Sequence, residues 1–266
     1  MQAQRLAAAA GQRYSCRSYT ADVPPNLDQL APFLTDGFEP FPHNSEVRFH
    51  ILDKPAVIQQ ILKGPWGPVS RLLLMAVRSD QPHYLEALGY AGQQLILEAT
   101  ALDIQTCWVA GMCDLKQAAR HFPGLDSPWS VQAVSPLGCG TSGSKTGMKQ
   151  KLFKFLSAQR GQRHGLDVLM HPTELASLPP VLVNAIQAAA KAPSALNRQP
   201  WRYALRGTEL IVSSTQTAPQ RTHPSRLDLG IAMLEFTAAV RAQGQDGHWQ
   251  PRQADANPVA AFVLSA

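Results

Sequence analysis

Two stretches of this chain follow the same pattern, and this internal repeat is the strongest constraint on its fold. Residues 84–112 and 225–249 each contain an acidic residue, a Leu-Gly pair, an amphipathic helix, a polar turn and a tryptophan. The acidic residue lies three positions before the glycine in the first copy (Glu86 and Gly89) but two positions before it in the second (Asp228 and Gly230). Self-similarity at this scale indicates a duplicated supersecondary unit, although α+β segments can also resemble one another by chance.

The segments around each copy extend the repeat. Each half has a Pro-Pro step that starts a helix, because a missing N–H costs nothing at a helix N-terminus. An apolar strand follows that helix, and another follows the repeat. The Pro-Pro steps are 24–25 and 179–180, and the strands are 47–52, 131–137, 201–205 and 259–264. The predicted order is helix, loop, strand, long helix, strand, which gives an α+β fold of two halves, 1–151 and 152–266. Residues 138–151 are rich in Gly, Ser and Lys and predict a mobile loop.

Composition excludes several classes of protein. Of the 266 residues 45% are hydrophobic and 16% charged, which rules out a disordered chain. The longest apolar run, 72–77, is far too short to span a membrane, and no secretory signal is evident. The four cysteines show no metal-binding spacing, so we expect reduced, packed thiols in a cytoplasmic protein. They are Cys16, Cys107, Cys113 and Cys139.

The positive charge points to a small anion rather than to nucleic acid. The net charge is +5, but the basic residues are scattered apart from one cluster at 145–154. No basic helix alternates with aromatic residues as in many nucleic-acid-binding proteins. Lys149 and Lys151 of this cluster could contact an anion, although a solvated loop is the better reading of these two residues alone.

Arg13, Ser15 and Arg17 form the first candidate anion site. Their spacing of two places all three side chains on one face of an extended segment. Guanidinium groups bind phosphate through two hydrogen bonds and stay charged. The motif therefore predicts a phosphate site, while two solvated surface arginines remain the alternative.

The second candidate site is the segment 192–203, which reads APSALNRQPWRY. Pro193 ends the preceding helix, and Ser194 offers a hydroxyl. The amides of Asn197 and Gln199 can each donate and accept hydrogen bonds, as a flat heteroaromatic ring with carbonyls and ring nitrogens requires. Trp201 then opens a strand. A helix-stop loop with incidental amides is the alternative, but this density of polar groups and prolines is unusual for a mere connection.

These residues resemble a known family. APSALNRQPWRY is similar to the APSxxNxQPWxF signature of the FMN-dependent nitroreductases, and residues 13–19 resemble that family's N-terminal RRSxRxF. Residues 88–111 resemble its central helix and the strand after it. In ordinary members the arginine motif and the Pro-Ser loop lie close together in one subunit, whereas here one lies in each half.

The resemblance implies a nitroreductase-like fold with mixed or antiparallel sheets. Family members bind FMN at a homodimer interface, so a fused chain could keep one complete site. Residues 168–172 lack the arginines, and residues 38–45 read as a degenerate Pro-Ser loop. We therefore expect a monomer acting as an internal pseudo-dimer, with one FMN site and no second one.

The resemblance also implies a role for each candidate residue. The arginine motif would bind the FMN phosphate and ribityl chain, the Pro-Ser loop would line the isoalloxazine, and Gln199 would support that loop. Backbone N–H groups at the strand end would face flavin N5 and O4, while the two lysines match the family's late basic ligands only loosely. The predicted cofactor-binding residues are Arg13, Ser15, Arg17, Ala110, Gly111, Lys149, Lys151, Pro193, Ser194, Ala195, Asn197 and Gln199.

The implied activity is transfer of hydride or electrons from NAD(P)H through flavin N5 to an electron-poor small organic acceptor. No side chain is predicted as a general acid, because the chemistry belongs to the flavin. Two alternatives stay open: a non-catalytic FMN-binding protein and a basic interaction module. We expect no metal, membrane or nucleic-acid partner.

Overall fold

The computed structural model describes residues 2–35, 45–141, 162–215, 225–252 and 259–265, and these contain two sheets with the same topology. Each is four-stranded, with the strand orders β1-β2-β4-β3 and β5-β6-β8-β7, and the pairing between neighbouring strands is antiparallel throughout. The strands of the first sheet are β1 (Val47–Leu52), β2 (Arg71–Arg78), β3 (Gln105–Thr106) and β4 (Trp129–Gly138). Those of the second are β5 (Trp201–Arg206), β6 (Glu209–Ser214), β7 (Gly247–Pro251) and β8 (Ala260–Leu264).

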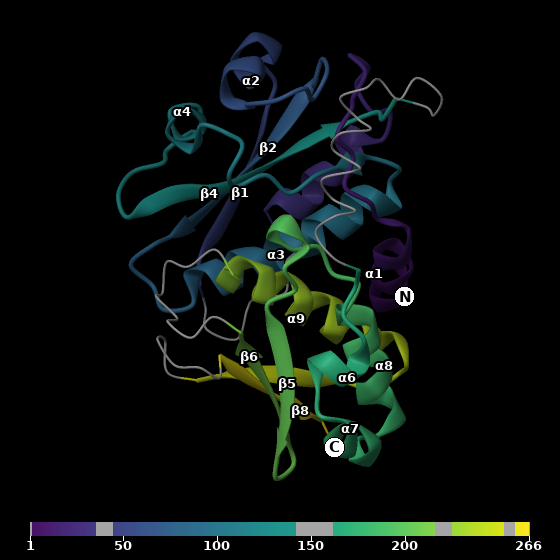
Figure 1. The fold of residues 1–266 in the computed structure, drawn as a ribbon. Helices are drawn as coiled ribbons and strands as arrows, with labels where there is room; N and C mark the ends of the chain where they lie inside the picture. The colour runs from purple at the N-terminus through teal and green to yellow at the C-terminus, as the bar shows by residue number, and fades with distance from the viewer. Residues whose placement is uncertain (1, 36–44, 142–161, 216–224, 253–258, 266) are drawn as a thin grey trace.

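Along the chain, one long helix lies between β2 and β3 and another lies between β6 and β7. These helices are α3 (Tyr84–Ala101) and α9 (Ser225–Ala242), and each has 18 residues. They pack against each other between the two sheets, so the layers run sheet, helix, helix, sheet (Figure 1). Both helices are apolar around most of their circumference, as expected for helices buried on every side.

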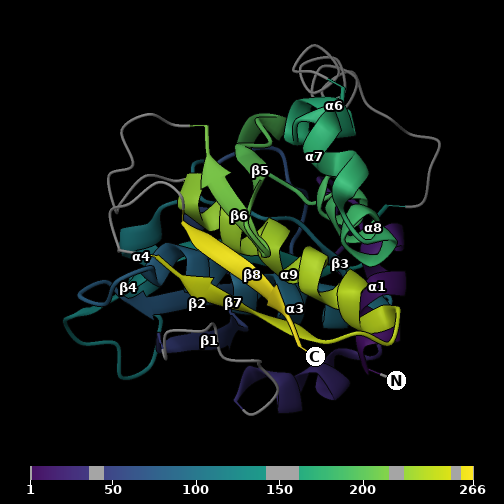
Figure 2. The ribbon, with the colours of Figure 1, turned by 90° about the horizontal axis from the view of Figure 1, so that it is seen from below.

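Shorter helices close the sides of this stack. Helix α1 (Gln2–Gln12) packs against both long helices, and α8 (Pro180–Ala189) packs against α9, as Figure 2 shows from below. The others are η1 (Leu27–Leu34), α2 (Pro55–Ile61), α4 (Leu115–Ala119), α6 (Leu166–Leu169), α7 (Pro172–Ser177) and η2 (Ala195–Asn197). Because α1 contacts α9, the N-terminus of the chain is tied to the second half of the sequence.

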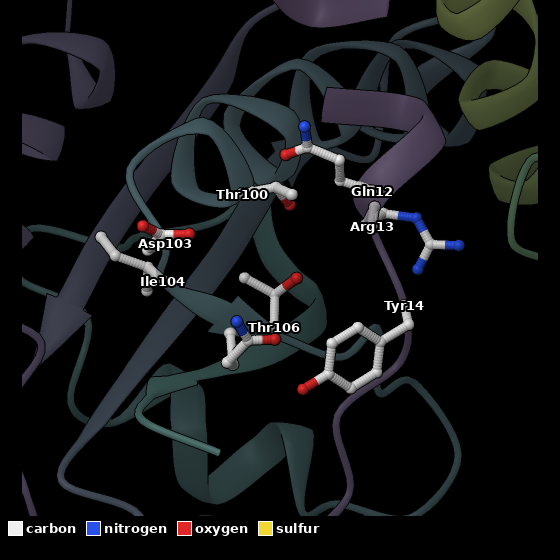
Figure 3. Close-up of a pocket in the computed structure, with 8 residues that line it drawn as sticks. Gln12, Arg13, Tyr14, Thr100, Asp103, Ile104 and Thr106 are labelled. Carbon is white, nitrogen blue, oxygen red and sulfur yellow. The ribbon is translucent and has the colours of Figure 1, made fainter. Parts of the chain in front are cut away.

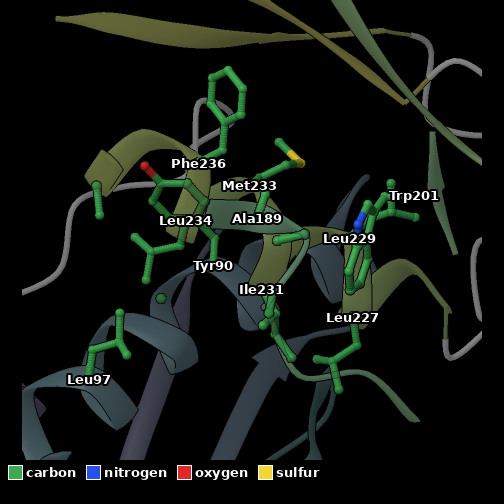
Figure 4. Packing of buried hydrophobic residues seen from close by; sticks show 14 of the residues in the cluster. Tyr90, Leu97, Ala189, Trp201, Leu227, Leu229, Ile231, Met233, Leu234 and Phe236 are labelled. Atoms are coloured by element: carbon green, nitrogen blue, oxygen red, sulfur yellow. The ribbon is translucent and has the colours of Figure 1, made fainter. Parts of the chain in front are cut away.

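One hydrophobic cluster extends through both halves. Figure 4 shows part of it, with Tyr90 and Leu97 of α3, Leu234 and Phe236 of α9, and Trp201 of β5. A second cluster lies only in the first half, on the face of the first sheet under α2 and α4. The shared cluster means that the two sheets do not have independent cores.

The structure contains the predicted helices and strands, and it also contains strands that the sequence analysis did not predict. The strands expected at 47–52 and 201–205 are β1 and β5, and the helix after Pro179 is α8. The predicted order omitted β2 and β6, which precede the long helices; the apolar run 72–77 lies in β2, almost fully buried. The helix expected after the first Pro-Pro step is the 3-10 helix η1, which contains Pro32. In the parts of the chain described above, no helix is both long and apolar enough to cross a membrane.

Candidate functional site

The arginine motif lies in an extended segment beside the first sheet. Arg13 follows α1, and its backbone N–H still donates to the carbonyl of Ala9. Ser15 then pairs in parallel with Thr106 of β3, and the N–H of Cys16 donates to the Thr106 carbonyl over 2.9 Å. The expected extended geometry is therefore present at Ser15, which places the motif next to the end of β3.

The guanidinium of Arg13 is largely buried. Burial lowers its pKa, and the nearby Glu235 carboxylate partly opposes this shift. The Nε atom of Arg13 is inaccessible to solvent and has no hydrogen-bond partner among the described residues. A buried donor without a partner is costly, so this atom marks a place where an acceptor would bind favourably.

A small pocket of about 70 Å³ lies between residues 12–14 and residues 100–106. Residues of α1, the end of α3 and β3 line it, among them Thr100, Asp103 and Thr106. In Figure 3 the Arg13 guanidinium points away from these three side chains. This pocket is far below the several hundred cubic ångströms of an ordinary cofactor site. This pocket by itself is therefore too small to hold such a cofactor.

Glu235 of α9 is a buried carboxylate that accepts a hydrogen bond from α3. It is 2% exposed, and burial raises its pKa to about 7, against the attraction of Arg13, a hydrogen bond from Gln93 and the charges of Arg163 and Lys191. Gln93 Nε2 donates to Glu235 Oε1 over 2.7 Å, and Trp108 Nε1 donates to Gln93 Oε1 over 2.8 Å. This hydrogen-bonded chain runs from α9 through α3 to the segment after β3.

The Pro-Ser loop holds an unusual backbone shape through its own polar groups. Leu196, Asn197 and Gln199 have φ angles of 56°, 55° and 47°, in the left-handed region that non-glycine residues seldom occupy. The Ser194 hydroxyl accepts from the N–H of Gln199 over 3.0 Å. The buried Gln199 side chain accepts from the N–H of His164 over 2.8 Å and donates to the Asn197 carbonyl over 3.1 Å. The loop is thus fixed from inside, with Leu196 exposed.

Asp228 anchors the same loop to α9. Both of its carboxylate oxygens accept from the N–H of Ala195, at 3.0 and 3.2 Å. Burial raises the pKa of Asp228 to about 7, while the Ala195 N–H and the charge of Arg198 act in the opposite direction. The N–H of Ala195 is therefore directed to a carboxylate of the protein.

Arg163 connects the loop to the buried carboxylate, and the sequence analysis did not single it out. Its Nη1 donates to the Ala192 carbonyl over 2.6 Å, directly before Pro193. Burial lowers its pKa, as does the positive charge of Arg13, while Glu235 opposes both. The sequence carries no signal for this role, since Arg163 stands in no recognisable motif. Only packing brings it close to Arg13 from the other half.

The remaining candidates divide between described and undescribed residues. Ala110 and Gly111 lie in a bend rather than in a strand, after Val109 pairs with Val134. Both are exposed, and a Cβ built on Gly111 would meet nothing within 4 Å. Lys149, Lys151 and most of the segment 38–45 lie outside the described residues, as does part of the 138–151 loop.

The donor set fits a phosphorylated heteroaromatic cofactor. Arg13, Arg17 and Arg163 supply positive charge for a phosphate, and the buried Nε atom of Arg13, which has no hydrogen-bond partner among the described residues, could donate to one of its oxygens. In the same described ranges, no group of three or more His, Cys, Asp and Glu side chains could hold a metal ion.

Comparison with known proteins identifies the family of this chain. Residues 5–240 match the model of a family described as "Putative TM nitroreductase". The chain belongs to this nitroreductase family. A solved "putative nitroreductase" from Thermotoga maritima shares its fold, with a TM-score of 0.63 and 20% identity over 97% of this chain and 92% of that chain. No curated protein matches.

A second solved nitroreductase is similar over a smaller part of the chain. It comes from Desulfitobacterium hafniense and contains bound FMN; it is 14% identical, with a TM-score of 0.43, over 53% of this chain and 91% of its own.

Proposed function

We propose that this nitroreductase family member is an FMN-dependent oxidoreductase that uses NAD(P)H to reduce an electron-poor small organic acceptor. One observation carries the proposal: the buried Nε atom of Arg13, in the arginine motif, has no hydrogen-bond partner among the described residues, which favours an acceptor such as a phosphate oxygen there. The Pro-Ser loop lends support, because Arg163 donates a hydrogen bond to the carbonyl of Ala192 at its start, and both Arg13 and Arg163 are within electrostatic range of Glu235.

The proposal includes a single-chain pseudo-dimer whose halves are residues 1–151 and 152–266. Support comes from the identical strand orders of the two sheets and from the equivalent placement of α3 and α9 between strands. A duplication of this kind gives two related half-sites, of which one has the arginines and the other the Pro-Ser loop. We propose one FMN per chain and a monomer in solution.

Within this site, Arg13, Ser15 and Arg17 would bind the phosphate and ribityl end of FMN. Pro193, Ser194, Ala195 and Asn197 would line the ring, with Gln199 supporting the loop, and the backbone at Ala110 and Gly111 would face the ring edge. Lys149 and Lys151 are additional candidates for the phosphate. Asp228 is the side chain that holds the loop in place, through its hydrogen bonds with Ala195.

When bound, FMN supplies the hydride and electron transfer chemistry, and the protein supplies binding, orientation and electrostatics. Backbone N–H groups near the ring edge would stabilise negative charge there. The buried Gln93 side chain and the partly buried ring of Trp108 that donates to it would limit the access of water to the inner side of the site.

The proposal includes a cytoplasmic location, and the state of the cysteines supports it. All four cysteines are free, as a reducing compartment would leave them. Cys16 and Cys107 are buried in the packing beside the arginine motif.

The first experiment is a visible absorption spectrum of the purified chain with a flavin-to-protein ratio. A flavin spectrum at about one FMN per chain, followed by NAD(P)H oxidation with an electron-poor acceptor, is the expected result. A ratio near two would contradict the single-site arrangement. A colourless protein that does not bind added FMN would contradict the function itself.

The alternative is a protein that binds FMN but does not catalyse a reaction. One measurement distinguishes it from the proposed enzyme. Such a protein would show the same spectrum and the same ratio, but its flavin would not be reduced by NADH or NADPH in an anaerobic titration.

A further inference from the structure

The two long helices meet in a reciprocal contact that shows which of their positions are equivalent. The Cβ position of Gly89 on α3 falls on the carbonyl oxygen of Leu227, and that of Gly230 on α9 falls on the carbonyl oxygen of Glu86. Glu86 and Leu227 therefore occupy equivalent places in the two helices. The acid of the second helix stands one place later, at a position where the first helix has an alanine.

This difference of one place directs the two acids to different partners. Successive residues of an α-helix point about 100° apart around its axis. Glu86 forms a buried ion pair with Arg226 of the other long helix. Asp228 instead accepts hydrogen bonds from the N–H of Ala195, in the Pro-Ser loop. The position equivalent to Asp228 in α3 is Ala87, whose side chain cannot accept a hydrogen bond.

The contact with Asp228 joins the Pro-Ser loop to the layer of long helices. Ser194 and Gln199 fix the loop from inside, and Gln199 also binds the backbone at Gln162 and His164. Asp228 is 5% exposed and lies in the first turn of α9. A buried carboxylate is costly unless it is hydrogen-bonded, and for Asp228 the bonded group belongs to the loop.

Helix α9 also supports the arginine motif. Helix α1 packs against it, with Leu6 and Ala9 in the hydrophobic cluster that both halves share. Arg13 directly follows α1, and its N–H donates to the Ala9 carbonyl. One end of the candidate site is therefore fixed to α9 by packing, and the other end is fixed to the same helix through Asp228.

We propose that Asp228 is a positioning residue for the flavin ring, which fixes the Pro-Ser loop to α9 through the Ala195 N–H and so sets the place of the loop relative to the arginine motif. The inference rests on the proposed function, because it needs FMN at this site. It also gives a physical reason for the proposed single site, since Ala87 cannot anchor a loop in this way. A loop that is held before the ligand arrives costs less to order on binding, so the anchor strengthens binding of the ring.

The test is fluorescence titration of the flavin-free protein with FMN and with riboflavin, which has the ring without the phosphate. Asp228→Ala should weaken both ligands by the same factor, about tenfold to a hundredfold, as for loss of a hydrogen bond to a charged group. Asp228→Asn keeps an acceptor oxygen and should bind both ligands within about threefold of wild type. If riboflavin binds too weakly to titrate, the FMN affinities of the two variants decide.

Two further readouts separate a positioning role from a merely structural one. The visible circular dichroism of bound FMN should change in Asp228→Ala and return to that of wild type in Asp228→Asn. In the flavin-free wild type the Ala195 amide should already be protected from hydrogen exchange, because it is bonded to Asp228. This measurement needs no variant, so it decides if Asp228→Ala does not fold.

Glu174→Ala is the matched control. The Glu174 carboxylate also accepts from a backbone N–H, that of Leu205 over 3.0 Å, toward the far end of β5 from the Pro-Ser loop. Its removal takes away the same kind of contact and should change neither flavin affinity.

Three results would overturn the inference: an Asp228→Ala variant that binds FMN as tightly as wild type, an Asp228→Asn variant that binds it as weakly as Asp228→Ala, and an Ala195 amide that exchanges freely without flavin. Each leaves the proposed function standing, because the wild type still binds FMN. A wild type that binds neither FMN nor riboflavin would instead refute the proposed function, and this inference with it.

Discussion

Gly89 of α3 and Gly230 of α9 mark the point where the two long helices cross. A Cβ on Gly89 would lie 2.1 Å from the carbonyl oxygen of Leu227, and one on Gly230 would lie 2.0 Å from that of Glu86. Each glycine thus packs on the residue three positions before the other. This reciprocal contact is the pattern of a two-fold interface, here formed within one chain.

We predict that Gly89→Ala and Gly230→Ala each destabilise the protein strongly. The added methyl group meets backbone rather than a movable side chain, so the helices must separate, at a cost of about 3 kcal/mol or more in the free energy of unfolding. Urea unfolding measures this. Gly11→Ala is the control: Gly11 is exposed in α1 with nothing near its Cβ position, and alanine there should stabilise by about 0.5–1 kcal/mol. Equal effects at Gly89 and Gly11 would contradict the close crossing.

A second prediction concerns the buried ion pair between Glu86 and Arg226, which also joins the two long helices. Both side chains are at most 1% exposed. Arg226→Met should destabilise by about 3–5 kcal/mol, because Glu86 is left as a buried charge without its partner. The double change Glu86→Leu with Arg226→Met should recover most of that loss. Arg241→Met, at an exposed pair with Asp246, should cost less than about 1 kcal/mol.

A third prediction follows from the raised pKa values of Asp228 and Glu235, both about 7. Their folded-state values exceed the unfolded ones, so the folded protein binds more protons, and stability falls as pH rises from about 4 to above 7. For Glu235 the loss is about 3 kcal/mol, from a shift of roughly two pKa units or more. Glu235→Gln should therefore be more stable than wild type at pH 8 and equally stable near pH 4. Parallel stability curves for the two proteins would refute this.

A fourth prediction tests the arginine motif. Arg17→Ala should weaken FMN binding by roughly 2–3 kcal/mol, as for loss of a charge-assisted contact with phosphate, and should leave riboflavin binding unchanged. Fluorescence titration measures both affinities. Arg206→Ala removes an exposed arginine at the end of β5 and should affect neither ligand. Unchanged FMN affinity in Arg17→Ala would exclude this residue from the phosphate site.

Much of the fold was predictable because it depends on local patterns. The strands at Val47 and Trp201, the helix after Pro179 and the equivalence of the two long helices all follow from apolar periodicity and from proline placement. Strand β2 was missed because a short, continuous apolar run has no alternation that distinguishes a buried strand from a buried helix segment. The helix after Pro24-Pro25 was expected, but its 3-10 type was not specified; it contains Pro32.

Some residues of the candidate site could likewise be predicted from the sequence, and others could not. The arginine motif and the Pro-Ser loop could be found because their residue types are close together in the sequence. Glu235, Arg163 and Asp228 could not be identified as parts of a site, since each has its role only through partners in other elements.

By itself, the sequence indicated an α+β protein of the nitroreductase family, with a pattern that recurs in its two parts and with two separated motifs that resemble those of FMN-binding members. Motifs and repeats are local, and local residue patterns carry them completely. Only the tertiary structure decided that α3 and α9 cross in close contact at Gly89 and Gly230, because helix crossing is set by packing between residues more than a hundred positions apart. It also decided which partners anchor the Pro-Ser loop, since Asp228 of α9 accepts the hydrogen bond of the Ala195 N–H.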